Sequence, residues 1–281
     1  MIDKGIAFLS IYDSESYALR ILAAVLKQKG YLSHQIYFKR LHTPEFPYTQ
    51  KEVDILINLL TKLRVKLLAL SLRSSSLKSF SLLEPIIRQR IPGIQILMGG
   101  THATLVPDDA LSYADAICIG DGEDTMLEVA QKYEGNLASL SGIKGIRLSD
   151  SYPQDAGPSL RGAFEDLDSL PIEIYEDEDK YFIEENTISQ NEPLTGSSSI
   201  EVFASRGCPR QCTFCSNSIL NGIITLKGQK YVRTRGVRST IDNLLYLKKR
   251  FKNLRRVIFA DEVFGLDKEW VKEFCQIYPK E

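Results

Sequence analysis

The chain has 281 residues, a formal net charge of −1 at pH 7 and five cysteines. This length allows a sizeable core and about two domains, and the near-zero charge creates no field that would favour nucleic acid or an anionic membrane. Because no apolar run approaches the roughly 20 residues of a membrane span, and few cysteines without a signal peptide indicate a reducing compartment, we expect a cytoplasmic protein.

Residues 1–140 alternate short apolar segments with amphipathic ones. The apolar segments predict strands, and apolar residues spaced three to four positions apart predict helices. The predicted strands are residues 5–10, 34–38, 67–72, 94–98 and 116–119. The predicted helices are residues 14–29, 50–63, 77–89, 107–112 and 123–133. This alternation indicates an α/β fold with a doubly wound parallel sheet.

Ligands of such sheets bind outside the carboxyl ends of the strands. The candidate binding loops are residues 10–14, 71–76, 99–104 and 120–123. Dinucleotide binding normally requires Gly-x-Gly-x-x-Gly after the first strand, and the first loop here contains no glycine. The last loop, Gly120-Asp-Gly-Glu123, has carboxylates that would repel a phosphate. A plain turn in which Asp121 caps the next helix is an alternative for it.

Residues 141–199 are predicted to be a linker. Residues 143–148 are compatible with a small strand, but the acidic run 173–185 and the polar run 189–199 lack periodicity over most of their length. Such composition is typical of exposed, irregular segments.

Residues 200–281 form the third predicted region. A strand over residues 200–204 leads into a loop with three cysteines. A helix over residues 239–251, a strand over residues 255–264 and a helix over residues 268–278 follow it.

The three cysteines form the pattern Cys-x3-Cys-x2-Cys, at Cys208, Cys212 and Cys215. Thiolates select soft metals and iron–sulfur clusters, and three of them on a four-iron cluster leave one iron without a protein ligand. A structural zinc site would need a fourth Cys or His nearby. Cys118 and Cys275 are distant in sequence, and all three histidines precede residue 103. The pattern therefore favours an open 4Fe–4S cluster over zinc.

The run Ser205-Arg-Gly-Cys-Pro-Arg-Gln-Cys-Thr-Phe-Cys215 resembles the signature of radical S-adenosylmethionine (SAM) enzymes. The resemblance implies that Cys208, Cys212 and Cys215 bind the cluster and that Phe214 lies against the adenine of SAM. It also implies an external electron donor of the flavodoxin or ferredoxin type. In this family, one electron from the cluster cleaves SAM to methionine and a 5′-deoxyadenosyl radical.

Asp261 and Glu262 resemble a variant of the Gly-Gly-Glu strand of that family. The role of that strand is to receive the ammonium group of SAM, and a carboxylate is a suitable partner for a cation. The resemblance thus predicts that either residue contributes to SAM binding and not to the fold. The alternative is an exposed pair that caps the helix over residues 268–278.

Two further runs, Met98-Gly-Gly-Thr-His-Ala-Thr104 and Ile119-Gly-Asp-Gly-Glu-Asp-Thr125, resemble the cobalamin-binding domain that precedes the cluster domain in one radical SAM subclass. In that fold the corrin lies on the strand ends, and its nucleotide tail enters a slot beside the glycine pair, where a missing Cβ allows close approach. The cofactor-binding positions that the resemblance implies are Ser10, Ser71, Ser74, Gly99, Gly100 and Gly120. The alternative is a related domain that has lost its cofactor.

The histidine loop of many cobalamin proteins, Asp-x-His-x-x-Gly, is missing. Cobalt is therefore predicted to have no histidine ligand from this chain. His102, beside the glycine pair, is expected either to contact the nucleotide tail or to be a hydrogen-bonded loop residue.

Together the resemblances cover nearly all of the chain, with a cobalamin-binding-like domain at residues 1–140, a linker at 141–199 and the start of a radical SAM partial TIM barrel at 200–281. They imply a cobalamin-dependent enzyme acting on a small-molecule substrate, with methyl transfer to an unactivated carbon favoured. An oxidative cyclase or rearrangement enzyme, and a cofactor-binding fragment without turnover, are the alternatives. Because a complete barrel takes roughly 250 residues, we expect the chain to be part of a longer protein.

Overall fold

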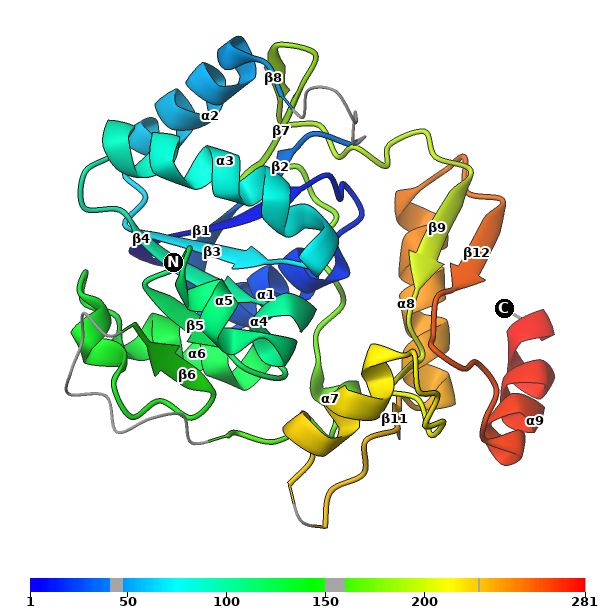
Figure 1. Ribbon diagram of the computed structural model, residues 1–281. Coiled ribbons are helices and arrows are strands. Elements are labelled where there is room, and N and C mark those ends of the chain that lie inside the picture. Colours follow the sequence, from blue (N-terminus) through cyan, green and yellow to red (C-terminus); the bar gives the residue numbers. More distant parts are fainter. Residues whose placement is uncertain (41–47, 150–159, 227, 281) are drawn as a thin grey trace. The chain divides into compact units, whose positions relative to one another are not determined.

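The computed structural model describes residues 1–40, 48–149, 160–226 and 228–280. They form two compact units, shown in Figure 1. Unit 1 comprises residues 1–162 and 173–193, and unit 2 comprises residues 163–172 and 194–281.

Unit 1 is built on an eight-stranded sheet with the order β6-β5-β4-β3-β1-β2-β7-β8. Neighbouring strands from β5 to β7 pair in parallel, and the two edge strands β6 and β8 are antiparallel to their neighbours. The strands are β1 (Ile2–Ile11), β2 (Tyr31–Phe38), β3 (Leu67–Ser71), β4 (Gln95–Gly99), β5 (Ala116–Cys118), β6 (Ile146–Leu148), β7 (Lys180–Glu184) and β8 (Thr187–Ser189).

Helices cover both faces of this sheet, with α1 beside α6 on one face and α2 beside α3 on the other (Figure 1). The helices are α1 (Tyr17–Gln28), α2 (Gln50–Lys62), α3 (Ser74–Arg90), α4 (Thr101–Leu105), α5 (Pro107–Leu111) and α6 (Glu123–Lys132). The central strands are apolar on both faces for this reason, and residues 5–11 of β1 are all buried. The predicted doubly wound sheet is confirmed, although the short helix α4 was not predicted.

The prediction of an exposed linker is wrong for residues 173–193, which belong to unit 1. β7 lies parallel to β2, and β8 turns back along it. Arg20 of α1 donates hydrogen bonds of 2.7 and 2.8 Å to the carboxylate of Glu192, which also accepts from Lys180. All three side chains are buried. Charged residues are rarely buried unless they are paired. Arg20 and its partner Glu192 lie far apart in sequence, so the composition of residues 173–193 alone did not indicate that they are buried in unit 1.

Unit 2 contains the parallel pair β9 (Ser199–Val202) and β12 (Arg256–Phe259), together with the short antiparallel pair β10 (Ser205–Arg206) and β11 (Arg233–Thr234). Its helices are α7 (Ser216–Ile224), α8 (Val237–Arg250) and α9 (Lys268–Ile277). Parallel neighbours joined through helices are the β/α units with which a barrel begins, as predicted. The helix α7, directly after the cysteine loop, was not predicted.

Residues 163–172 are joined to the rest of unit 2 by hydrogen bonds. The carbonyl oxygen of Phe164 accepts a 2.8 Å hydrogen bond from Arg233, and Asp168 accepts one of 2.8 Å from the backbone N–H of Gly236. The second contact satisfies a free N–H group at the beginning of α8. No helix in the described ranges is long and apolar enough to cross a membrane.

Candidate cofactor sites

A cavity of about 280 Å³ lies at the carboxyl ends of β1 and β3 in unit 1. It is lined by Ser10, Ile11, Tyr12, Asp13, Ser71, Arg73, Ser75 and Ser76. β1 and β3 are neighbours in the sheet, and the chain builds the sheet outward from them in opposite directions. This is the topological switch point, where open α/β sheets bind their ligands.

Two of the predicted serines line this cavity and one does not. Ser10 and Ser71 are in its wall, and the Ser10 hydroxyl donates a 2.8 Å hydrogen bond to the carbonyl oxygen of Asp13. The Ser74 hydroxyl instead lies 3.0 Å from Nδ1 of His102. Its neighbours Ser75 and Ser76 line the cavity and were not predicted. The run of three serines could be recognised in the sequence. The contact with His102 holds Ser74 outside the cavity wall, which Ser75 and Ser76 line.

Contacts within the chain itself explain why position 100 of the glycine pair requires glycine. Gly100 has a φ of +91°, and a Cβ placed there would lie 2.7 and 2.8 Å from the backbone oxygen and nitrogen of Leu72. A Cβ at Gly99 would make ordinary contacts with Cys118 and Leu70. Gly120 has a φ of +86°, and its N–H donates a 3.1 Å hydrogen bond to the Thr104 hydroxyl. None of these glycines is in the cavity wall, and the close approach at Gly100 is to protein backbone.

His102 is a buried, partnered residue, 4% exposed. Besides the Ser74 contact, its Nε2 lies 3.1 Å from a carboxylate oxygen of Asp109, without the alignment of a good hydrogen bond. Both ring nitrogens thus face side chains of this chain. The Ser74 contact agrees with the expectation of a hydrogen-bonded residue, but His102 lies in the short helix α4 and not in a loop.

The polar groups of the cavity suit cobalamin. Its wall combines serine hydroxyls with the guanidinium of Arg73 and the carboxylate of Asp13, which lie 3.6 Å apart. Hydroxyl groups both donate and accept hydrogen bonds, guanidinium donates and carboxylate accepts. The corrin ring carries amide side chains around its edge, and amides also donate and accept. The residues present therefore fit that group.

The cysteine loop of unit 2 exposes its thiols to different degrees. Cys212 is exposed, Cys208 and Cys215 are half-buried, and all three are free. The Cys208 sulfur accepts a 3.4 Å hydrogen bond from the N–H of Arg210, and the Cys215 sulfur lies 3.9 Å from the amide nitrogen of Asn217. Hydrogen bonds to sulfur are among the factors that tune iron–sulfur clusters.

Within the described residues, no three His, Cys, Asp or Glu side chains are placed to hold a metal ion. The three thiols thus lie on one loop, but their positions in the described structure do not converge on a single metal ion. Three soft donors on one short loop still suit an iron–sulfur cluster by their chemistry. Phe214, between the second and third cysteine, is 91% exposed and available for contact with a ligand.

Gly207 fixes the beginning of this loop. It has a φ of +90°, and a Cβ at this position would lie 2.4 Å from the carbonyl oxygen of Tyr231. Its N–H donates a 3.2 Å hydrogen bond to the carboxylate of Glu262. One of the two predicted SAM-binding carboxylates therefore holds the residue just before the first cysteine.

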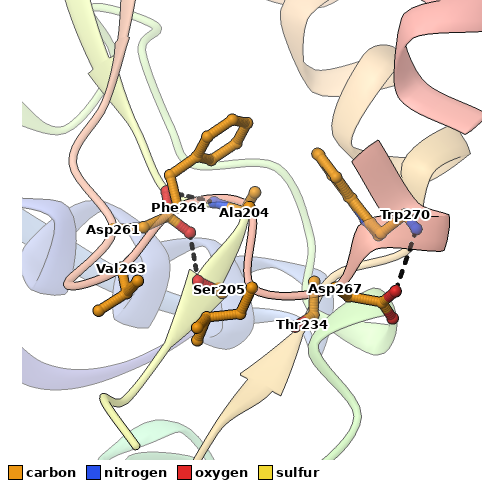
Figure 2. A pocket seen from close by; sticks show the side chains of 10 residues that line it. Ala204, Ser205, Thr234, Asp261, Val263, Phe264, Asp267 and Trp270 are labelled. Carbon is orange, nitrogen blue, oxygen red and sulfur yellow. Dashed lines mark hydrogen bonds between the residues drawn. The ribbon is translucent and has the colours of Figure 1, made fainter. Parts of the chain in front are cut away.

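Asp261 holds the end of β9 (Figure 2). Its carboxylate accepts a 3.2 Å hydrogen bond from the N–H of Ala204 and another from the hydroxyl of Ser205. It lines a small cavity of about 20 Å³ together with Thr234 and Trp270. The prediction that Asp261 and Glu262 do not contribute to the fold is therefore wrong. A carboxylate has about four lone-pair sites, so each retains acceptor capacity for an ammonium group.

The alternative role of that pair, as caps of the following helix, belongs to another residue. Asp267 is the N-cap of α9, and its carboxylate accepts hydrogen bonds of 2.9 and 3.2 Å from the N–H groups of Glu269 and Trp270.

The B12 binding domain family matches residues 5–130, the part of unit 1 that contains the cavity and the glycine pair. The chain is 28% identical over 179 residues to an uncharacterized methyltransferase of Pyrococcus horikoshii, covering 62% of this chain and 34% of that protein. It is 28% identical over 178 residues to cytidylyl-2-hydroxyethylphosphonate methyltransferase of Streptomyces wedmorensis, covering 55% and 32%.

A third relative, with 27% identity over 198 residues, is the anaerobic magnesium-protoporphyrin IX monomethyl ester cyclase of Rubrivivax gelatinosus, with 68% of this chain and 32% of that protein covered. The chain spans about a third of the length of these curated relatives. The region that matches the B12 binding domain family is thus followed by the three-cysteine loop, and the chain is similar to methyltransferases and to a cyclase.

Proposed function

We propose that this chain is part of a cobalamin-dependent radical SAM enzyme that transfers a methyl group to an unactivated carbon of a small-molecule substrate. The observation that carries the proposal is the order of two sites in one chain, a B12 binding domain with a cavity at its switch point and then a Cys-x3-Cys-x2-Cys loop. The similarity to methyltransferases supports the reaction type.

Each set of residues has a distinct part in this proposal. Cys208, Cys212 and Cys215 would hold a 4Fe–4S cluster, and Asp261 or Glu262 would accept hydrogen bonds from the SAM ammonium. Phe214 would lie against the adenine. When bound, the cluster and SAM supply a carbon radical, and cobalamin carries the methyl group. The residues around the unit 1 cavity would orient the cobalamin.

Oxidative ring closure is the second candidate. It is favoured by the similarity to the magnesium-protoporphyrin monomethyl ester cyclase, whose alignment covers a larger share of this chain than those of the two methyltransferases. The proposal also includes a cytoplasmic location and a flavodoxin- or ferredoxin-type electron donor. The free thiols of the described cysteines suit a reducing compartment.

Anaerobic reconstitution with iron and sulfide tests the cluster. The wild-type protein is expected to take up about four irons and four sulfides per chain, with an absorbance band that is bleached by reduction and a spectrum that SAM perturbs. Cys212→Ala should lose most of this iron, whereas Cys275→Ala, which changes an exposed cysteine of α9, should keep it. Equal iron in both variants would refute the ligand assignment, and recovery of zinc alone would refute the enzymatic proposal.

Product analysis separates the two reactions. Methyl transfer is expected to consume two SAM molecules for each product, one as radical source and one as methyl source, giving S-adenosylhomocysteine together with 5′-deoxyadenosine. Ring closure would give 5′-deoxyadenosine without S-adenosylhomocysteine. The assay requires reduced flavodoxin and added cobalamin.

A further inference from the structure

Tyr12, the residue directly after β1, has an unusual backbone. Its φ is +60°, in the left-handed region where a side chain with a Cβ is sterically disfavoured. Its N–H donates a 3.1 Å hydrogen bond to the carbonyl oxygen of Phe38 at the end of β2, which fixes the residue at the carboxyl edge of the sheet. Strained non-glycine residues of this kind concentrate at binding and catalytic sites.

Tyr12 has a buried hydroxyl group and also belongs to the cavity wall. Its hydroxyl oxygen is shielded from solvent, and this burial, with Tyr48 and Glu52 close by, raises the pKa of the phenol well above its ordinary value. Another part of the residue lines the cavity at the switch point. The hydroxyl end is therefore enclosed by protein, whereas the residue as a whole is half-buried and lies in the cavity wall.

Tyr12 differs in kind from the other residues of the cavity wall. Four of them are serines, two are the charged pair Asp13 and Arg73, and Ile11 is 2% exposed. Tyr12 is thus the aromatic group of this wall, and it is half-buried. A rigid ring adds contact area at a low cost in conformational entropy, which suits the recognition of a large, flat ligand.

We propose that Tyr12 is a positioning residue for cobalamin, whose ring forms the surface against which the edge of the corrin packs. Tyr12 would supply the apolar contact in this wall, and the serines would supply polar contacts around it. This inference rests on the proposed function, because it takes cobalamin as the ligand of the cavity. It assigns to Tyr12 a role that the sequence patterns did not indicate.

Four variants of the full-length protein test this proposal. Tyr12→Gly and Tyr12→Asn remove the ring and suit a positive φ, because glycine has no Cβ and asparagine tolerates this conformation. Tyr12→Phe keeps the ring and removes the hydroxyl. Arg64→Gly is the matched control, because Arg64 also has a positive φ, +52°, and is not in the cavity wall.

The readouts are the dissociation constant for hydroxocobalamin, from absorbance titration, and the melting temperature without cobalamin. We expect Tyr12→Gly and Tyr12→Asn to bind at least about tenfold more weakly while still unfolding in one cooperative thermal transition without cobalamin. Tyr12→Phe and Arg64→Gly should bind within about twofold of wild type.

Wild-type affinity in both ring-deleted variants would overturn the inference and leave the proposed function intact. A loss in Tyr12→Phe as large as in Tyr12→Gly would also overturn it, because the hydroxyl and not the ring would then be responsible. A wild-type protein that binds no cobalamin would overturn the proposed function and the inference together.

Discussion

Two buried cations share one carboxylate in unit 1. Arg20 and Lys180 both donate to Glu192, the ring of Tyr175 lies 4.6 Å from the Arg20 guanidinium, and the three charged side chains have no exposed surface. The cations hold the pKa of the Glu192 carboxyl below its ordinary value despite burial, which by itself would raise that pKa. The cluster joins α1 to β7 and to residue 192, so it fastens residues 173–193 to the sheet.

Replacing Glu192 and replacing Lys180 should have different effects on the stability of unit 1. Glu192→Gln removes the carboxylate to which both buried cations donate and is expected to destabilise unit 1 by about 3–5 kcal/mol. Lys180→Met removes one of two neighbouring buried cations, leaves Arg20 paired with Glu192, and should be neutral or stabilising at neutral pH. Urea unfolding followed by circular dichroism checks both. Similar large losses in the two variants would show that Lys180 is needed to neutralise Glu192.

Stability should also depend on pH through Lys180. Burial, followed by the nearby charge of Arg20, lowers the pKa of Lys180 from 10.5 to about 8. The unfolded chain therefore holds more protons than the folded protein between these values, and the free energy of unfolding should rise with pH across that window. Melting temperatures at about pH 7.5 and about pH 9.5 should show a larger upward shift, or a smaller decrease, for wild type than for Lys180→Met.

Residue roles were predictable where the signal is local in sequence. The three cysteines lie within eight consecutive residues, so their spacing alone located them on one loop. Ser74 was assigned to the cofactor although its neighbours line the cavity, because its orientation depends on His102, 28 residues away. The positive φ of Tyr12 was not predicted, because no sequence pattern indicates this backbone conformation at a tyrosine.

At the scale of elements, the loops after β3 and β4 meet at Gly100. Gly100→Ala would place a Cβ against the Leu72 backbone and add the cost of a positive φ, whereas Gly93→Ala at a φ of +84° has no neighbour within 4 Å. We expect Gly93→Ala to cost about 1 kcal/mol and Gly100→Ala about 2 kcal/mol more. Thermal unfolding of the two variants measures the difference. Equal costs would mean that the two loops separate readily.

Elements with strong apolar periodicity were predicted within a few residues, as for β1, α2 and α8. β7 and β8 were not, because acidic residues flank them and the pairing of β7 with β2 spans more than 140 residues of sequence. Three of the five residues of β7 are only half-buried, and a strand whose faces are partly exposed needs fewer apolar residues. Composition therefore favoured a linker where the structure has two strands.

At the scale of the whole molecule, the boundary of unit 1 can be tested by truncation. A fragment of residues 1–193 contains β7, β8 and Glu192 and should give a cooperative thermal transition. A fragment of residues 1–162 leaves β2 as an exposed parallel edge and Arg20 buried without its carboxylate, so it should aggregate or unfold. Equal stability of both fragments would show that residues 173–193 are dispensable for unit 1.

The path of the chain determines when unit 1 can finish folding during synthesis. The chain leaves unit 1 after residue 162, contributes residues 163–172 to unit 2, and returns to complete unit 1 with residues 173–193. Domains generally fold as units from the N-terminus while the chain emerges from the ribosome at about 5–20 residues per second. Here unit 1 stays incomplete until residue 192 has emerged. Until then Arg20 lacks its partner, the carboxylate of Glu192. A nascent chain arrested shortly before this point should therefore be more sensitive to protease than one arrested shortly after it.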